Sequence, residues 1–316
     1  MTLPPRIGFL ALLAGLLASG TTLGAQEPGR SSTTFKSTVE VVTVSAVVRD
    51  RDGRLVPHLT ANDFEVLDGG LPRKIISFRS TPEPISIALL FDISGSMESA
   101  IKFPRAREAA HQMLSWLDAS IDEVALFTFD TALEQLRGFG KPSPELTTMI
   151  AMLRPFGATS LRDAIAAAAG RVIARGRARR AVVVLTDGVD TASRMTAAQV
   201  SGAASAIDVP VYILATVSPV DHAGEKFAVD GVGDAIRGEL SDLAHWTGGE
   251  FFMTSVPAHV SLAVRQIVDE LRQQYLIAVE PGEAPGWHAL EVRTRDKRLT
   301  VRARSGYFAA GVERVR

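Results

Sequence analysis

The chain has 316 residues, of which 46% are hydrophobic and 22% are charged, so it is long enough for one medium-sized domain and a smaller appended one. Its formal net charge of -1 argues against a nucleic-acid partner, because phosphate binding needs a strongly basic face. The absence of cysteine excludes disulfides, thiol nucleophiles and cysteine zinc sites.

The N-terminus has the pattern of a secretory signal peptide over residues 1–25. Arg6 precedes an apolar run over residues 7–17, and small residues follow, with cleavage expected after Gly24 or Ala25. The run is shorter than the roughly 20 residues that span a bilayer. We therefore expect an exported protein, periplasmic or secreted, without a transmembrane segment in the mature chain. An uncleaved N-terminal anchor is the alternative.

A linker rich in Ser and Thr over residues 26–34 leads into a small β unit over residues 35–80. Val and Thr dominate residues 35–49, which predicts one long strand. A short helical turn after Thr60 and strands over 64–67 and 74–78 follow. Such a unit is too small to be stable alone, so we expect it to pack against another part of the chain.

From residue 85 to residue 273, apolar strands alternate with helices. Strands are predicted over 85–91, 123–129, 181–186, 211–215 and 250–253. Helices are predicted over 101–117, 146–153, 160–174, 196–206, 238–246 and 258–271, and residues 218–237 are expected to form a loop. Continuous runs of Val, Ile, Leu and Ala indicate strands buried on both faces. The pattern predicts an α/β domain over 84–273, with a doubly wound, mostly parallel sheet flanked by helices.

The tail, residues 274–310, returns to short strands. The first is expected at an edge of the α/β sheet. The other two are expected to form a hairpin around "RDKR" and to pair with the N-terminal β unit. Both ends of the chain would then build one small accessory β domain.

Three segments with polar side chains fall at the expected carboxyl edge of the sheet: "FDISGSM", "GATSLRDA" and "LTDGVD". Together they supply carboxylates and hydroxyls, namely Asp92, Ser94, Ser96, Thr159 and Asp187. Hard oxygen ligands suit Mg²⁺, Ca²⁺ or Mn²⁺ and do not suit zinc. The three segments together predict a divalent-cation site.

These segments resemble the von Willebrand factor type A domain, a Rossmann-like fold, over roughly residues 84–273. "DISGSM" is similar to its D-x-S-x-S motif, "GATSLRDA" resembles its threonine loop, and "VVVLTDGVD" resembles its second aspartate strand. The flanks, including the terminal "SGYF", are similar to those of bacterial exported proteins related to this family. One departure is Ala158, where many relatives have glycine, and we expect it to stiffen the threonine loop slightly.

The resemblance implies a metal-ion-dependent adhesion site and no enzymatic activity. Asp92 would hold the ion, commonly through water, and Asp187 would act directly or through water. Ser94, Ser96 and Thr159 would offer hydroxyl ligands. Mg²⁺ is the ion expected first, with Mn²⁺ or Ca²⁺ as alternatives. An Asp or Glu of a protein partner would complete the coordination, which implies an adhesion or scaffold role.

Two other functions stay open. Asp92 at a strand end is also where a phosphotransfer enzyme or hydrolase places a nucleophile. Ser94, and the lack of a lysine next to the motif, argue against that function. A serine hydrolase is disfavoured because "ISGSM" lacks the first glycine of a nucleophile elbow. The third hypothesis is a structural module whose site is unused. Asp130 and Asp190 are expected to support the site rather than to bind the ion.

Overall fold

The computed structural model describes residues 41–176, 179–206, 208–217 and 231–309. The predicted signal peptide, the predicted linker and the first part of the strand expected over 35–49 lie outside the described residues. Among the described residues, no helix is long and apolar enough to cross a membrane.

A six-stranded sheet lies at the centre of the α/β segment. Its strands, in spatial order, are β10 (Phe251–Thr254), β9 (Val211–Thr216), β8 (Arg179–Thr186), β5 (Ile85–Asp92), β6 (Glu123–Phe129) and β7 (Leu133–Gly140). Strands β10 to β6 run parallel, and β7 pairs antiparallel with β6 at the edge. The predicted α/β class is confirmed, and the sheet is mixed.

Strand β7 has no counterpart among the predicted elements. Its sequence, LEQLRGFG, mixes charged and apolar residues, and none of them is fully buried. A strand at a sheet edge needs no continuous apolar run, so the hydrophobic pattern indicates it only weakly.

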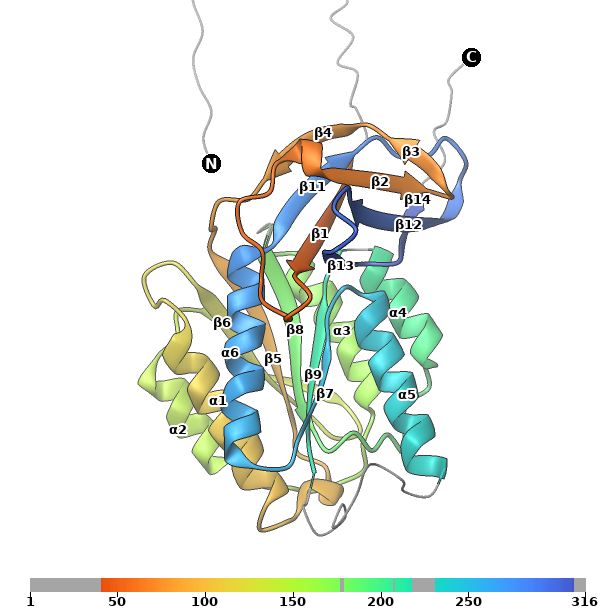
Figure 1. Cartoon of the computed structure of the whole chain (residues 1–316). Coiled ribbons are helices and arrows are strands. Elements are labelled where there is room, and N and C mark those ends of the chain that lie inside the picture. The colour runs from red at the N-terminus through yellow and green to blue at the C-terminus, as the bar shows by residue number, and fades with distance from the viewer. Residues whose placement is uncertain (1–40, 177–178, 207, 218–230, 310–316) are drawn as a thin grey trace, which may run out of the picture. The chain divides into compact units, whose positions relative to one another are not determined.

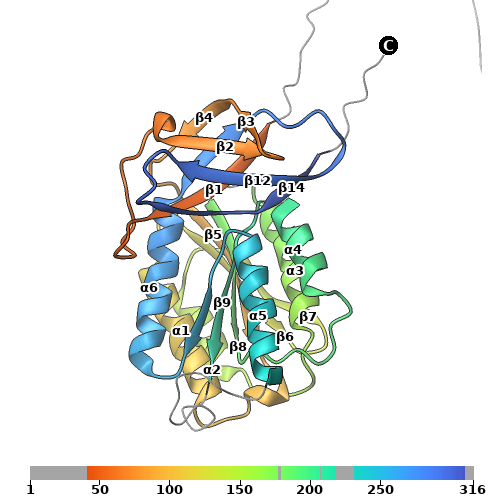
Figure 2. The same ribbon diagram turned by 45° about the vertical axis from the view of Figure 1, so that its right-hand side comes forward.

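Helices cover both faces of the central sheet (Figures 1 and 2). One face packs against α1 (Lys102–Trp116), α2 (Pro144–Met152) and α6 (Pro257–Gln273). The other packs against α3 (Leu161–Ile173), α4 (Ala197–Ala206) and α5 (Gly231–Trp246). Strand β5 is buried along its whole length because Ile87 and Leu89 face the first set of helices while Ala88 and Leu90 face the second.

Helix α5 begins at Gly231, so residues 231–237 are helical and not part of the loop expected over 218–237. The rest of that segment, 218–230, lies outside the described residues. The helix opens with Gly-Val-Gly-Asp, and glycine disfavours helix strongly enough that sequence patterns assign such a start to a loop.

The flanks form two four-stranded sheets that share one apolar core. The first sheet has the order β13 (Thr300–Ala303), β1 (Val42–Arg49), β11 (Tyr275–Val279) and β4 (Ile75–Arg79). The second has the order β14 (Gly306–Ala309), β12 (Gly286–Thr294), β2 (Phe64–Asp68) and β3 (Leu71–Arg73). A 3-10 helix, Ala61–Asp63, follows Thr60. Each sheet combines strands from both ends of the chain, so the expected pairing between the flanks is present.

Two expectations about the tail are wrong. Strand β11 lies between β1 and β4 and does not join the central sheet. The ring of Tyr275 lies 5.1 Å from that of Phe64 and 5.6 Å from that of Phe78, so its aromatic contacts hold it in the flank core. Strands β12 and β13 do not form a hairpin with each other, because β12 pairs with β14 and β2 while β13 pairs with β1.

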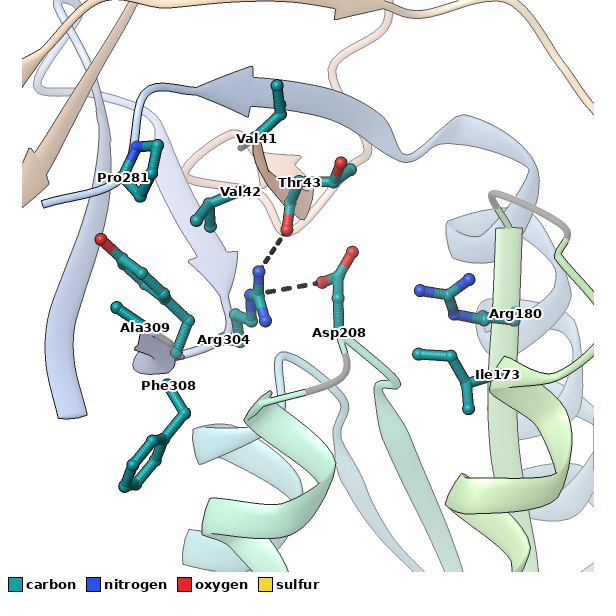
Figure 3. Close-up of a pocket in the computed structure, with 11 residues that line it drawn as sticks. Val41, Val42, Thr43, Ile173, Arg180, Asp208, Pro281, Arg304, Phe308 and Ala309 are labelled. Atoms are coloured by element: carbon teal, nitrogen blue, oxygen red, sulfur yellow. Dashed lines mark hydrogen bonds and ion pairs between the residues drawn. The ribbon is translucent and has the colours of Figure 1, made fainter. Parts of the chain in front are cut away.

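Polar contacts join the flank strands to the α/β segment around Arg304 (Figure 3). The Arg304 guanidinium is buried, donates to the carbonyls of Thr43 and Ser205, and lies 3.6 Å from Asp208 Oδ1. Asp208 also accepts hydrogen bonds from the Ser45 amide at 3.3 Å and the Ser45 hydroxyl at 3.2 Å. Thr43, Asp208 and Arg304 line a cavity of about 310 Å³. Buried polar groups are stable only when paired, and here the pairs fix the flank strands to the loop after α4.

A second junction lies around Glu270 of α6. Its carboxylate is fully buried and accepts hydrogen bonds from Arg49 of β1 and Arg302 of β13. Arg302 also pairs with Glu250, next to β10. Removing one partner of a buried pair leaves an uncompensated charge and destabilises the fold. The stability of α6 and that of the flank strands are therefore coupled through these contacts.

Candidate metal centre

The candidate site lies where β5 and β8 end. These parallel neighbours are paired up to Phe91 and Leu185. Asp92, the last residue of β5, and Asp187, which follows the last residue of β8, therefore emerge at the same edge of the sheet. Ligands of open α/β sheets bind at this edge, outside the carboxyl ends of the strands. After β5 the chain turns through the 3-10 helix Gly95–Met97, which presents Ser96 beside Asp187.

Asp92 is fully buried at the base of the site. Its Oδ1 accepts a hydrogen bond from the Ser94 amide at 2.8 Å, and its Oδ2 accepts one from the Thr186 hydroxyl at 2.5 Å. Burial raises the pKa of the Asp92 carboxyl to about 6. Burial disfavours the charged form of a carboxyl, and a nearby cation favours it. The ionised Asp92 is therefore a group that a cation would stabilise.

Hydroxyl groups connect this base to the second aspartate. The Ser94 and Ser96 hydroxyl oxygens lie 3.0 Å apart, and the Ser96 hydroxyl donates to Asp187 Oδ1 at 3.2 Å. The Val189 amide also donates to that oxygen, at 3.2 Å. Hydrogen bonds thus bring Asp92, Ser94, Ser96 and Asp187 together, as the motifs predict.

Lys102 is a residue of the site that the sequence reasoning missed. Its ammonium donates to Asp187 Oδ2 at 3.0 Å and to the Ser96 carbonyl at 3.3 Å. No lysine stands next to the motif in the sequence, but the fold brings Lys102 to the site, so the lack of a lysine no longer argues against a phosphotransfer function. A signal exists, because Lys102 stands in the first turn of α1, where the helix dipole disfavours a cation unless an anion lies nearby.

Thr186 is the other residue that was missed. Its hydroxyl donates to Asp92 and accepts a hydrogen bond from the Gly188 amide at 3.0 Å, so it links the two aspartate segments. The sequence indicates this role only through the position of Thr186, which ends a predicted strand and directly precedes Asp187.

The threonine loop, residues 156–160, docks on the turn after β5. The Phe156 amide donates to the Ile93 carbonyl at 2.5 Å, and the Gly95 amide donates to the Gly157 carbonyl at 2.8 Å. Thr159 is buried, and its amide donates to the Thr191 hydroxyl at 3.1 Å. Within the described chain, no hydrogen bond joins the Thr159 hydroxyl to the other four predicted ligands. The loop is thus held at the site through its backbone.

The left-handed position of this loop is Gly157 and not Ala158. Gly157 has φ +92°, and a side chain there would meet Asp130 Oδ2 at 3.0 Å. Ala158 has no positive φ, so alanine is accommodated without backbone strain. The Asp130 carbonyl accepts a hydrogen bond from the Ser160 amide at 2.6 Å, which fixes the other end of the loop.

Asp190 supports the start of α3. Its Oδ2 accepts hydrogen bonds from the Arg162 amide and from Arg162 Nε, each at 3.0 Å. Its Oδ1 accepts one from the Ser193 amide at 3.1 Å. A carboxylate at a helix N-terminus is favourable, and here it also holds the segment that contacts Thr159.

The donor set is one of hard oxygens. Among the described residues, no group of three or more His, Cys, Asp or Glu side chains is placed to hold a metal ion. Any ion here would rest on two carboxylates, Asp92 and Asp187, and on the serine hydroxyls that connect them. Oxygen donors of this kind, completed by water, fit Mg²⁺, which usually binds proteins through few carboxylates.

Comparison with known proteins finds one family model that matches part of the chain. Residues 87–189 match the sequence model of the von Willebrand factor type A domain, so the resemblance predicted from the motifs is confirmed. Domains of this family generally mediate protein interactions and adhesion. The search of curated proteins found no match.

Several solved structures are similar to the chain at low identity. A von Willebrand factor type A protein from Catenulispora acidiphila is 14% identical, with a TM-score of 0.48 over 89% of this chain and 76% of that one. The conserved hypothetical protein BatB from Bacteroides thetaiotaomicron is 16% identical, with a TM-score of 0.46 over 59% of this chain and 98% of that one. Proximal thread matrix protein 1 from the mussel byssus is 15% identical, with a TM-score of 0.47 over 71% of this chain and 50% of that one.

Proposed function

We propose that the von Willebrand factor type A domain of this chain binds a divalent cation, Mg²⁺ first, and through it an acidic side chain of a protein partner. Asp92, Ser94, Ser96, Thr159 and Asp187 would hold the ion, directly or through water. The protein would act as an adhesion or scaffold component and not as an enzyme.

One observation carries this proposal: the hydroxyls of Ser94 and Ser96 form a hydrogen-bonded path to Asp187, and the Ser94 amide is bonded to the buried Asp92. Oxygen atoms gathered in this way are suited to surround a small hard cation. The buried carboxylate of Asp92, whose pKa is raised to about 6, gives the ion a further favourable interaction.

The charge at the site favours an anionic partner. Lys102 already places one positive charge beside Asp187. A divalent ion would balance the two carboxylates, and the site would then carry the excess positive charge of Lys102. An acidic side chain offers both the missing oxygen ligand and the missing negative charge, whereas a neutral group offers at most the ligand.

The place of action in this proposal is outside the cytoplasm. It depends on the signal-peptide pattern of residues 1–25, with Arg6 ahead of the apolar run. Secretion of a reporter fused after Ala25, compared with the same fusion with Arg6 and the apolar run deleted, tests this part.

A titration with a peptide that carries one carboxylate tests the proposed metal-dependent binding. A short capped peptide with one glutamate is titrated into the protein in Mg²⁺ and in a chelator, with a glutamine peptide as the control. We expect binding only for the glutamate peptide in Mg²⁺, and its loss in Asp92→Ala and Ser96→Ala. Equal binding with and without Mg²⁺ would contradict the proposal.

The phosphotransfer alternative gains one observation, which is the lysine at the site. Lys102 forms an ion pair with Asp187, and a phosphotransfer enzyme would need a lysine near its aspartate nucleophile. Against it, Asp92 is fully buried and each of its oxygens accepts a hydrogen bond, whereas a nucleophile needs an oxygen that the substrate can reach. Incubation with acetyl phosphate and Mg²⁺, followed by intact mass measurement, decides: a phosphoryl group located on Asp92 favours the enzyme.

A further inference from the structure

A cavity of about 470 Å³ lies beside the candidate metal centre. It is lined by the turn after the serines (Glu98, Ser99), by α1 (Phe103, Arg107) and by the segment after α2 (Arg154, Pro155). The cavity and the metal centre share the same two loops. Glu98 follows Ser96 by two residues, and Pro155 directly precedes Phe156, whose amide is bonded to the Ile93 carbonyl.

Two guanidinium groups meet at this cavity. Arg107 lies over the Phe103 ring, 4.6 Å from its centroid, and donates to the Leu153 carbonyl. Arg154 donates to the carbonyls of Ala151 at 3.3 Å and Leu153 at 2.9 Å. Both arginines are thus held in place at the C-terminal end of α2. Arg107 Nε is buried and has no hydrogen-bond partner within the described chain.

Neither arginine has a counter-ion in the described part of the chain. Glu98 lines the same cavity but forms no ion pair with Arg107 or Arg154, which donate to backbone carbonyls instead. Burial and the charge of Arg154 lower the pKa of Arg107. Two neighbouring cations that form no ion pair with a carboxylate favour the binding of an external anion.

Two exposed apolar residues stand next to the cavity-lining segment in the sequence. Phe156 is 79% exposed and Met152 is 73% exposed. A single exposed apolar residue is ordinary, but these two flank the segment that carries Arg154 and Pro155. Aromatic residues, methionine and arginine are the types enriched at protein interfaces.

We infer that this cavity is a second anchoring point for the same protein partner, and that it takes a second acidic side chain of that partner. This inference rests on the proposed function, because the first acidic side chain is the one that reaches the ion. The partner segment then carries two carboxylates, with an apolar residue against Phe156 and Met152. Charge complementarity selects this occupant, since the cavity offers two cations and one carboxylate, Glu98.

Capped peptides of defined charge test the inference. One peptide carries a single glutamate, and a series adds a second glutamate at increasing spacing from the first. In Mg²⁺ we expect one spacing to bind about fivefold more tightly than the single-glutamate peptide, the gain of one partly exposed ion pair. In Arg107→Gln/Arg154→Gln the gain disappears, while the single-glutamate peptide binds as it does to the native chain.

A charge-matched double variant controls for net charge. Arg171 lies near the C-terminal end of α3 and Arg298 lies between β12 and β13, both exposed. Arg171→Gln/Arg298→Gln should keep the full gain. A single-stranded oligonucleotide serves as a second probe, and tighter binding of it than of every peptide would overturn the inference in favour of a nucleic-acid partner.

The two proposals fail in different ways. If the single-glutamate peptide binds in Mg²⁺ but no second glutamate adds affinity, the second anchoring point is wrong and the metal-dependent function stands. If the gain persists in Arg107→Gln/Arg154→Gln, the cavity is likewise not its source. If no peptide binds the native chain in Mg²⁺, both proposals are wrong.

Discussion

Lys102 donates a hydrogen bond from its ammonium to Asp187 Oδ2 over 3.0 Å, so the second aspartate of the site already has a tethered cation. The Asp187 side chain is only 1% exposed, and the Lys102 side chain is 21% exposed. Loss of this partner would leave the buried carboxylate charge unpaired and would destabilise the folded protein. Lys102 therefore stabilises the site without an ion, and it would compete with the proposed ion for the same oxygen.

Lys102→Met should have opposite effects on folding and on ion binding. We expect the free energy of unfolding in a chelator to fall by about 1–3 kcal/mol, because Asp187 loses a charged partner. We expect the affinity for Mg²⁺ to rise roughly tenfold, because no ammonium has to leave the carboxylate. Urea unfolding and calorimetric titration measure the two effects. Lys141→Met, on the exposed loop after β7, is the control. An unchanged Mg²⁺ affinity in Lys102→Met would refute the competition between Lys102 and Mg²⁺ for Asp187.

Thr186→Val should destabilise the protein from the base of the site. The substitution removes the hydroxyl that donates to Asp92 Oδ2 and leaves a buried carboxylate oxygen without that bond. An unsatisfied buried polar group costs about 1–3 kcal/mol. Urea unfolding in a chelator should show this loss for Thr186→Val and little of it for Thr186→Ser, which keeps the hydroxyl. Equal stability of the two variants would mean that the hydrogen bond contributes nothing.

Gly157→Ala should disturb the threonine loop. The backbone has φ +92° at this position, and the new Cβ would meet the Asp130 side chain at 3.0 Å. Strain of this kind costs about 1–3 kcal/mol, and relief of it would move the loop away from Gly95. We expect a lower melting temperature and weaker Mg²⁺ binding.

The neighbouring residue supplies the matched control. Ala158→Gly introduces no strain and adds only freedom to the unfolded chain, at a cost of about 0.4–1 kcal/mol. If Ala158→Gly weakens Mg²⁺ binding as much as Gly157→Ala does, backbone strain at Gly157 is not the cause.

The flank sheets should lose stability above neutral pH. The hydrogen bond of His288 with the Ala284 carbonyl, followed by its 2.8 Å contact with Asp68, raises the pKa of His288 above its ordinary value of 6.5. The folded state therefore holds this proton more tightly than the unfolded state does. Its contribution is fully present below about pH 6.5 and is lost as the pH rises through the raised pKa.

Unfolding free energies measured from about pH 5.5 to 8.5 test this dependence. The native chain should lose stability across the upper part of that range relative to His288→Gln, which has no group that titrates there. His111→Gln, on α1, is the control for a histidine outside the flank sheets. A difference between native and His288→Gln that stays constant with pH would contradict the assignment.

Burial on both faces gives a strand a continuous run of apolar residues, and strands of this kind could be predicted from the sequence. Strand β5 is buried on both faces, and its continuous apolar run marks it with nearly correct bounds. Strand β7 is mostly half-buried and carries no such run. Strand β11 has an apolar run that fits either sheet, and only the contacts of Tyr275 with Phe64 and Phe78 decide between them.

The same distinction holds at the site. Asp92, Ser94 and Ser96 could be predicted because they share one short motif, and Asp187 because it follows a buried strand. Lys102 reaches Asp187 across 85 positions of the sequence, and Thr186 reaches Asp92 across 94. Neither contact follows from a local pattern, because each depends on the register of β5 beside β8. Side chains that support a site from a neighbouring element need the fold to be known.

The central claim is that the site binds a divalent cation, and a calorimetric titration of the metal-free chain with Mg²⁺ tests it most directly. We predict one Mg²⁺ per native chain, and no detectable binding to Asp92→Ala or Ser94→Ala under the same conditions, with both variants folded by circular dichroism. No Mg²⁺ binding to the native chain, or undiminished binding to both variants, would contradict the account.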